Sequence, residues 1–157
     1  MYYSQYDSPV GKLLLTCDGE SLTGIWMDRE PPDGAGTGHP LLTRVEAWLD
    51  AYFRGQPAAV DFLLKPEGTD FQKLVWNLLL EIPFGQTRTY GQLAREVADR
   101  TGVERMSAQA IGGAVGRNPI SIIIPCHRVV GSGGQLTGYA GGLDKKKWLL
   151  RHEGADI

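Results

Sequence analysis

The chain has 157 residues, of which 42% are hydrophobic and 22% are charged. This length and composition are typical of a globular protein in one or two domains, and they exclude an intrinsically disordered chain. The formal net charge of −2 argues against a protein that binds polyanions over its whole surface.

The charge is unevenly distributed along the chain. Residues 1–64 contain 4 Lys and Arg against 9 Asp and Glu, a net −5, whereas residues 65–157 contain 12 against 9, a net +3. A nucleic-acid-binding face should therefore belong to the second half, although ordinary charge scatter explains the same numbers. Within residues 86–136 every cation is an arginine: Arg88, Arg95, Arg100, Arg105, Arg117 and Arg128.

No apolar run approaches the roughly 20 residues that span a bilayer, and residues 1–6 lack the basic start and apolar middle of a signal peptide. We therefore expect a cytoplasmic protein without a membrane partner. The spacing of Cys17 and Cys126 matches neither a disulfide framework nor a metal clip. Free thiols, no bound metal and no cofactor are expected, with Cys17 in a strand.

The first half of the chain predicts a small antiparallel sheet followed by one helix. Strands are expected over residues 2–6, 12–17 and 22–27, with Asp18-Gly19 as a turn, and residues 30–40 are expected to form a loop. The helix is predicted by apolar residues at helical spacing that stop before Gly55, namely Leu41, Leu42, Val45, Trp48, Leu49, Tyr52 and Phe53.

A linker is expected over residues 56–68, because this segment contains Pro57, Pro66 and Gly68 and coincides with the change in charge. We place the domain boundary between Leu64 and Lys65. The sequence thus predicts an N-terminal domain over residues 1–64 and a C-terminal domain over residues 65–157.

Two capping boxes mark helices in the second half. Thr69 and Thr89 each precede a glutamine by three residues, ahead of apolar positions at helical spacing. The first helix should end before Pro83 and the second near Gly102.

Ser107 is expected to cap a third helix over residues 108–115, which forms a helix-turn-helix-like pair with the helix over residues 90–100. Its residues are unusually small. Glycine in a helix interior costs roughly 1 kcal/mol relative to alanine. Either close internal packing or approach of the backbone to an outside surface, such as a DNA groove, should explain Gly112 and Gly113.

A buried, β-rich run is predicted over residues 120–130, interrupted by Cys126, His127 and Arg128. A cysteine beside a histidine and an arginine has an electropositive setting, which favours the thiolate that a sulfur nucleophile requires. Adjacent side chains of an extended segment point to opposite faces, so a bridging water or a turn after Pro125 is expected between the thiol and the imidazole.

The histidine also needs a carboxylate to fix its tautomer, and spacing alone does not select one. The alternative interpretation of the same residues is a packed core thiol beside a hydrogen-bonded structural histidine.

The second half resembles the O6-alkylguanine-DNA alkyltransferases over residues 71–154. The resemblance rests on PCHRV at residues 125–129, Asn118-Pro119, GYAGG at residues 138–142 and KWLLRHEG at residues 147–154. Over residues 1–64 only the order of elements is similar. The resemblance implies an α+β fold, with a small ribonuclease H-like sheet domain followed by a mainly helical domain that carries the helix-turn-helix and the cysteine loop.

The resemblance also implies catalytic roles. Cys126 would accept the alkyl group from guanine O6, His127 would deprotonate it through a water, and Glu153 would support that histidine. Tyr90 would push at the target phosphate and donate toward the base N3, and Asn118 would join the recognition helix to the active-site loop.

The implied partner is double-stranded DNA containing O6-alkylguanine, bound through its minor groove by a monomer. The base would leave the stack, because its O6 otherwise lies in the major groove. Tyr139 would assist at O6, and Ser132 would flank the alkyl pocket. The residues expected to contact substrate or DNA are Tyr139, Ser132, Gln109, Ser107, Ala108, Ala110, Gly113 and Arg128.

One position departs from the family pattern. Gln109 stands where the family usually carries an arginine that fills the vacated stack, and it is shorter and uncharged. We therefore expect slower flipping and repair than in arginine-bearing relatives, unless Arg105 takes over this role.

Three other functions are considered. An alkyltransferase-like protein would bind and flip alkylated guanine without repair, but such proteins replace the reactive cysteine that this chain keeps. A helix-turn-helix transcription regulator would give no reason for residues 125–128. A cysteine hydrolase would turn over repeatedly, whereas a thioether on Cys126 is a poor electrophile and should end the reaction after one transfer.

Overall fold

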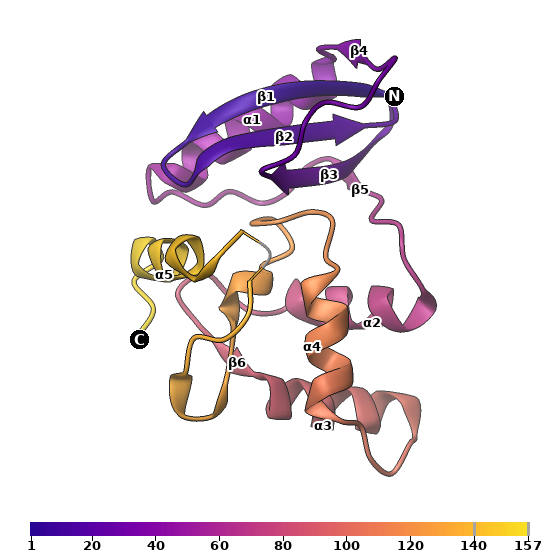
Figure 1. Ribbon diagram of the computed structural model, residues 1–157, viewed down its shortest axis with the longest axis vertical. Coiled ribbons are helices and arrows are strands. Elements are labelled where there is room, and N and C mark those ends of the chain that lie inside the picture. Colours follow the sequence, from indigo (N-terminus) through magenta and orange to yellow (C-terminus); the bar gives the residue numbers. More distant parts are fainter. Residues whose placement is uncertain (140, 157) are drawn as a thin grey trace. The chain divides into compact units, whose positions relative to one another are not determined.

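The computed structural model describes residues 1–139 and 141–156; Ala140, inside the GYAGG motif, lies outside the described residues. The chain divides into two compact units (Figure 1). The first unit comprises Met1–Glu67 and Pro119–Ser121, and the second comprises Gly68–Asn118 and Ile122–Ile157.

The first unit is built on a five-stranded sheet in the order β4-β1-β2-β3-β5. β1 (Tyr2–Ser8), β2 (Gly11–Cys17) and β3 (Ser21–Met27) form an antiparallel meander, as predicted. Cys17 ends β2 and is buried. The segment Pro119–Ser121 joins the same sheet, since the backbone N–H of Ile25 donates to Pro119 over 3.0 Å.

Two short strands correct the sequence prediction. The expected loop over residues 30–40 contains β4 (Gly36–Thr37), which pairs in parallel with β1, and the expected linker over residues 56–68 contains β5 (Leu63–Leu64), which pairs in parallel with β3. Each has two residues and a partner distant in sequence, so local composition does not indicate either of them.

The helix α1 (Pro40–Phe53) packs on one face of the sheet (Figure 1). His39 caps it, because its Nδ1 accepts a hydrogen bond from the backbone of Leu41. The apolar stripe expected from the sequence supplies its buried residues, which are Leu41, Leu42, Val45, Leu49 and Tyr52.

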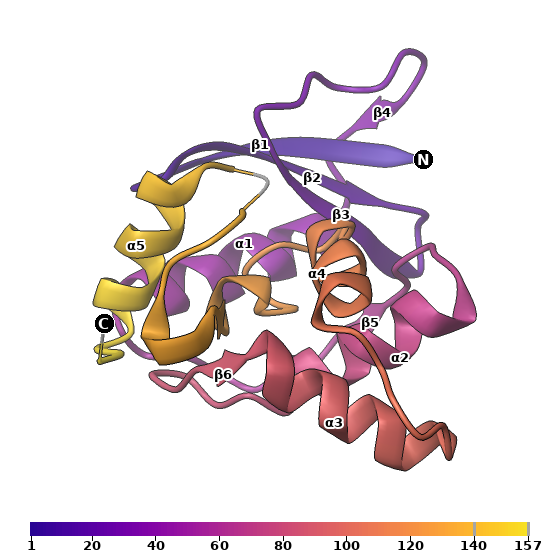
Figure 2. The same ribbon diagram turned by 60° about the horizontal axis from the view of Figure 1, so that its bottom comes forward.

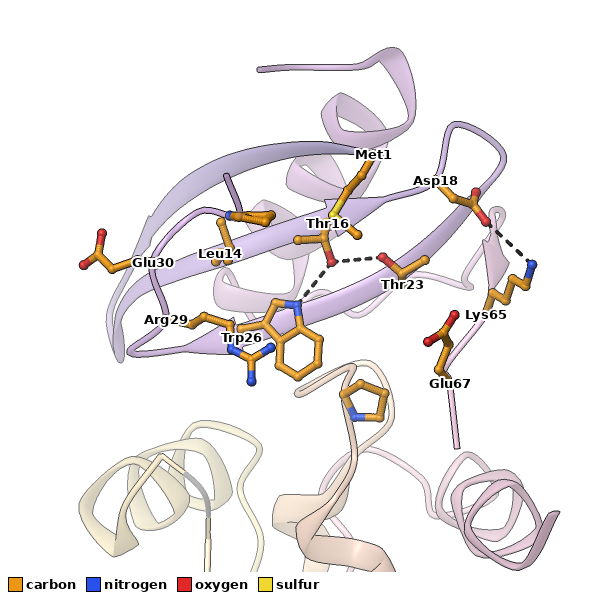
Figure 3. Close-up of a pocket in the computed structure, with 12 residues that line it drawn as sticks. Met1, Leu14, Thr16, Asp18, Thr23, Trp26, Arg29, Glu30, Lys65 and Glu67 are labelled. Carbon is orange, nitrogen blue, oxygen red and sulfur yellow. Dashed lines mark hydrogen bonds and ion pairs between the residues drawn. The ribbon is translucent and has the colours of Figure 1, made fainter. Parts of the chain in front are cut away.

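A cavity of about 480 Å³ lies in the first unit, against the sheet (Figure 3). Trp26 lines it and donates from Nε1 to Oγ1 of Thr16 over 3.2 Å. The indole covers Gly24, where an added Cβ would lie 2.0 Å from the Trp26 Nε1, so no larger residue fits at this position without moving the indole. None of the residues predicted to act in catalysis or DNA binding lines this cavity.

The second unit is mainly helical (Figure 2). Both predicted capping boxes are present, at Thr69 before α2 (Asp70–Leu79) and at Thr89 before α3 (Tyr90–Thr101). Ser107 caps α4 (Ala108–Gly116). Trp76 of α2 donates to the carbonyl of Ala114 over 2.9 Å and so joins α2 to α4. The remaining elements are β6 (Arg88–Thr89), the short helix η1 (Cys126–Arg128), β7 (Val129–Val130), the short helix η2 (Ser132–Gly134) and α5 (Leu143–His152).

The predicted β-rich run over residues 120–130 is buried, but most of it is not strand. The run forms a single bridge to β3 at Ile120, turns at residues 121–124, continues into η1 and is a strand only in β7. The prediction of an extended segment through Cys126 was therefore wrong, whereas the alternative of a turn after Pro125 is confirmed.

The predicted α+β fold, with an N-terminal sheet followed by a helical part carrying a helix-turn-helix, is confirmed. Among the described residues, no helix is both long enough and apolar enough to cross a bilayer.

Candidate active site

Tyr90 and Cys126 flank a pair of short strands and act on one another electrostatically. β6 lies parallel to β7, with Arg88 opposite Val129 and Thr89 opposite Val130. Tyr90 follows β6 directly as the first residue of α3, and η1, which begins with Cys126, directly precedes β7. Because the strands are parallel, Tyr90 and η1 stand at opposite ends of this pair, and the effect of the thiol on the pKa of Tyr90 shows that the two side chains are neighbours.

The turn before Cys126 is tied to the end of α4. The carbonyl of Ile124 accepts a hydrogen bond from Asn118 Nδ2 over 2.7 Å and another from the Cys126 backbone over 2.8 Å. Ile122 has a φ of 72°, which is costly for a β-branched residue. Asn118 therefore lies between the end of α4 and the cysteine turn, and the role that the resemblance implies for it stays a prediction.

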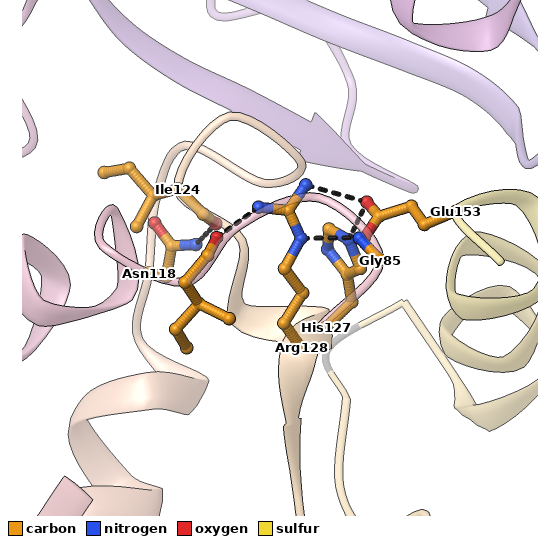
Figure 4. Close-up of polar contacts among 7 residues, drawn as sticks. Gly85, Asn118, Ile124, His127, Arg128 and Glu153 are labelled. Carbon is orange, nitrogen blue, oxygen red and sulfur yellow. Dashed lines mark hydrogen bonds and ion pairs between the residues drawn. The ribbon is translucent and has the colours of Figure 1, made fainter. Parts of the chain in front are cut away.

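Behind the cysteine, a buried carboxylate joins a histidine and an arginine (Figure 4). Oε2 of Glu153 lies 2.7 Å from Nε2 of His127. Arg128 donates to the same carboxylate from Nε over 2.7 Å and from Nη2 over 2.9 Å. The backbone N–H of Gly85 adds a fourth donor over 3.3 Å.

These contacts define the protonation states. Burial opposes ionisation of Glu153, but the hydrogen bonds from His127 and Arg128 outweigh it and hold the pKa of Glu153 well below its usual range. Burial lowers the pKa of His127, although the contact with Glu153 acts in the opposite direction. The ionised carboxylate only accepts, so the neutral imidazole carries its proton on Nε2. Nδ1 of His127 is buried and has no hydrogen-bond partner among the described residues, so it is left as an open base.

The cysteine itself differs from the sequence prediction. Cys126 is 7% exposed, and burial raises the pKa of its thiol, while Asn118, Lys146 and Tyr139 lower it by a smaller amount. The prediction of a setting that favours the thiolate was therefore wrong. Its physical reason is that burial outweighs the neighbouring cations, and that Arg128 is committed to Glu153 rather than to the thiol. A resting thiol needs a base, and Nδ1 of His127 is the available one.

Lys146 is a site residue that the sequence analysis missed. Its side chain is fully buried, and Nζ donates to the carbonyls of Thr137 over 2.9 Å and Gly138 over 3.2 Å. Burial lowers the pKa of Lys146 to about 8. The sequence contained an indication that Lys146 is buried. It shares the i, i+3, i+4, i+7 spacing of one helical face with three other residues, namely Leu149, Leu150 and Glu153.

Two tyrosines accompany the thiol. Tyr90 is half-buried, its hydroxyl donates to the carbonyl of Thr137 over 3.1 Å, and burial raises its pKa. Tyr139 is half-buried and acts on the pKa of Cys126. The exposed Ser132 lies in η2, in the segment that leads to Tyr139.

The helix α4 presents a smooth exposed face. Ala108, Gln109, Ala110 and Gly113 are exposed, and a Cβ added to Gly113 would meet nothing within 4 Å. Internal packing therefore does not explain this glycine, and approach of an outside surface is the remaining alternative. Ser107 is exposed and uses its hydroxyl as the helix cap, accepting from Ala110.

Arg128 does not lie where a DNA contact would need it. Arg128 is only 9% exposed. Its guanidinium donates to the carboxylate of Glu153 and also, over 2.6 Å, to the carbonyl of Ile82. The prediction that Arg128 contacts DNA is corrected on this ground. Within residues 1–139 and 141–156, no cluster of three His, Cys, Asp or Glu side chains could hold a metal ion.

Comparison with known families agrees with this geometry. Residues 70–155 match the family described as 6-O-methylguanine DNA methyltransferase, DNA binding domain, and residues 1–66 match its ribonuclease-like domain.

Individual relatives match along nearly the whole chain. A protein of Methanosarcina acetivorans named methylated-DNA–protein-cysteine methyltransferase is 44% identical, with 99% of both chains covered. A protein of the same name from Haemophilus influenzae is 43% identical over 98% of this chain and 86% of its own. The crystal structure of Mycobacterium tuberculosis OGT in complex with DNA is 43% identical and superimposes with a TM-score of 0.84, covering 98% of this chain and 93% of that one.

Proposed function

Because the chain belongs to the 6-O-methylguanine DNA methyltransferase family, we propose that it repairs DNA by moving an alkyl group from guanine O6 irreversibly onto its own Cys126. The observation that carries the proposal is the relay behind the cysteine. His127, the residue after Cys126, is buried and has an open Nδ1. Its Nε2 lies 2.7 Å from Oε2 of the ionised Glu153, which belongs to the same unit. A packed structural thiol would have no use for such a relay.

The reaction begins with the thiol. The proton of Cys126 passes through a water to Nδ1 of His127, and the positive charge that develops on the imidazole is balanced by Glu153. The sulfur then attacks the alkyl carbon, so that a C–S bond forms as the C–O6 bond breaks. The electron pair of the broken bond goes to guanine, which regains one proton, so a thiol and an alkylguanine give a thioether and guanine.

Two side chains serve the leaving guanine in this proposal. Tyr90 donates its one hydroxyl proton to the carbonyl of Thr137 in the free protein; when the base enters, this proton turns from Thr137 toward N3 of the base, and the ring presses on the target phosphate. Tyr139 assists at O6, and Ser132 flanks the alkyl pocket. A thioether carbon is a poor electrophile, so each molecule acts once.

DNA is bound through its minor groove by the exposed face of α4. Ser107, Ala108, Ala110 and Gly113 allow a close approach, because small side chains leave the backbone near the groove. The target base leaves the stack to reach the buried thiol, and Gln109 occupies the space beside it. Asn118 links this helix to the cysteine turn through Ile124.

The proposal needs no cofactor, because the displacement uses only a thiol and a relay of protons. Every catalytic residue belongs to one chain, so a monomer suffices. We also propose that this monomer acts in the cytoplasm.

The test is an intact-mass measurement before and after incubation with a duplex containing one O6-methylguanine. We expect one added methyl group, mapped to Cys126, with a stoichiometry of one per molecule. Cys126→Ser should gain no mass, and Cys17→Ser should behave as wild type.

The same experiment separates the alternatives. A protein that binds the damaged duplex without gaining mass would be a non-repairing alkyltransferase-like protein. Repeated release of product without any modified protein would overturn the stoichiometric mechanism.

A further inference from the structure

We propose that Arg128 is a positioning residue for the base that activates the thiol. Its guanidinium holds and neutralises Glu153, so that His127 rests uncharged with Nδ1 open. The inference rests on the proposed transfer to Cys126 and adds one residue to it.

The first argument is geometric. Nε and Nη2 of Arg128 bind the two different oxygens of Glu153, at 2.7 Å and 2.9 Å, which fixes the plane of the carboxylate (Figure 4). Nη1 is held in turn by the carbonyl of Ile82 at 2.6 Å. The orientation of Glu153, and hence of the ring that it holds at 2.7 Å, is therefore set by the arginine.

The second argument concerns charge. The Glu153 carboxyl is fully buried, so an uncompensated negative charge there would draw a proton onto the carboxylate or onto His127. Arg128 supplies the compensating charge. The charged or titratable groups that act on His127 or adjoin it are Lys146 of α5, Glu153 at the C-terminal cap of α5, and Arg128 and Cys126 of η1.

Removal of the arginine charge should therefore raise the pH at which the His127–Glu153 pair binds a proton. If that proton goes to Nδ1 of His127, the base is lost directly. If it goes to Glu153, the carboxyl becomes a donor to Nε2, so the single proton of the neutral ring must sit on Nδ1 instead of Nε2 and the base is lost again. In either case, as the pH is lowered, the rate of methyl transfer begins to fall at a higher pH in the variant than in the wild type.

The experiment measures the single-turnover rate of methyl transfer from an O6-methylguanine duplex against pH. In Arg128→Gln we expect the acid limb to move upward by about one pH unit or more. In Arg128→Lys we expect the limb to stay near the wild-type position while the maximal rate falls, because the charge remains but the two-point geometry is lost. A merely structural role would lower both rates without separating the two profiles.

Arg100→Gln is the matched control. Nη2 of Arg100 also contacts both carboxylate oxygens of one glutamate, Glu81, at 3.2 Å each, but the pair is exposed. Its pH profile should equal that of the wild type. An unshifted acid limb in a folded Arg128→Gln would overturn the inference.

A second measurement does not depend on the stability of the variants. The ¹⁵N NMR shifts of the His127 ring in the wild-type protein should show a neutral ring with its proton on Nε2 at pH 7. An Nδ1–H tautomer or an imidazolium would overturn the role of Arg128. This result stands whether or not the wild type transfers methyl, so failure of the proposed function is distinguished from failure of the inference.

Discussion

Lys146 donates a hydrogen bond from a fully buried side chain to the carbonyl oxygen of Thr137, 2.9 Å away. The same carbonyl accepts the hydroxyl of Tyr90 at 3.1 Å. One backbone oxygen in the loop after η2 thus joins the start of α3 to α5, and it does so beside the cysteine. The lysine is an internal support for the loop rather than a surface cation.

The pH dependence of stability should report this burial. Burial lowers the pKa of Lys146 to about 8 from its ordinary 10.5, so the folded protein releases this proton before the unfolded chain does. Stability should rise with pH between these values, by up to about 3 kcal/mol. Urea unfolding of wild type and Lys146→Met at pH 7 to 10 measures it, and a constant difference between the two would contradict the assignment.

Glu153 should change stability in the same direction as Lys146, but in the acid range. Its pKa is lowered in the folded protein, so its stabilising contribution is fully present above the pKa of an unfolded glutamate and is lost as the pH falls through the folded value. At pH 7 Glu153→Gln should lose about 3 to 5 kcal/mol, because Arg128 is left buried without its counter-ion. The loss should shrink toward pH 3.

Glu81→Gln serves as the comparison for that variant. It removes an exposed carboxylate that contacts Arg100 at 3.2 Å, and it should cost less than about 1 kcal/mol. Equal losses in the two variants would show that burial does not govern the Glu153 contacts.

Cys126 should behave as a thiol at neutral pH. Burial raises its pKa, so reaction with iodoacetamide should be slow at pH 7 and should increase at a pH above the midpoint of an ordinary thiol, about 8.5. The measurement uses Cys17→Ser, which leaves Cys126 as the one cysteine of the 157 residues. A midpoint at or below pH 7 would mean that a thiolate is present at rest.

Local patterns predicted the helices well and the cysteine turn poorly. The capping boxes at Thr69 and Thr89 involve residues three apart, so the sequence alone reveals them. The turn at Ile122 depends instead on the hydrogen bond between Asn118 and Ile124, which no apolar run indicates. Residues with strand propensity are bent there by tertiary contacts.

Some residues of the candidate site could be found from the sequence, and others could not. Cys126 and His127 are adjacent in a distinctive motif, and the family resemblance supplied Glu153. Lys146 was overlooked because it stands in a run of three lysines that suggests a solvated surface. Arg128 was expected to contact substrate or DNA, whereas its burial beside Glu153 gives it an internal partner that a local pattern does not reveal.

The exposed face of α4 should tolerate larger side chains in the free protein but not in the complex. Gly113→Ala should stabilise the fold by about 1 kcal/mol, since nothing lies within 4 Å of the added Cβ. Gly113→Leu should remain folded yet bind duplex at least tenfold more weakly. Methyl transfer from free O6-methylguanine should be unchanged in both, and duplex binding equal to wild type in Gly113→Leu would remove α4 from the interface.

Gln109→Arg should speed repair of a duplex. The exposed Gln109 is uncharged, and an arginine would add both a longer hydrogen-bonding group for the space left by the flipped base and an attraction to phosphate. The single-turnover rate on duplex should rise several-fold, while transfer from the free base, which needs no flipping, should stay constant. Gln86→Arg adds the same charge elsewhere in the second unit and should leave both rates near wild type. If Gln109→Arg is no faster than wild type on duplex, flipping does not limit repair at this position.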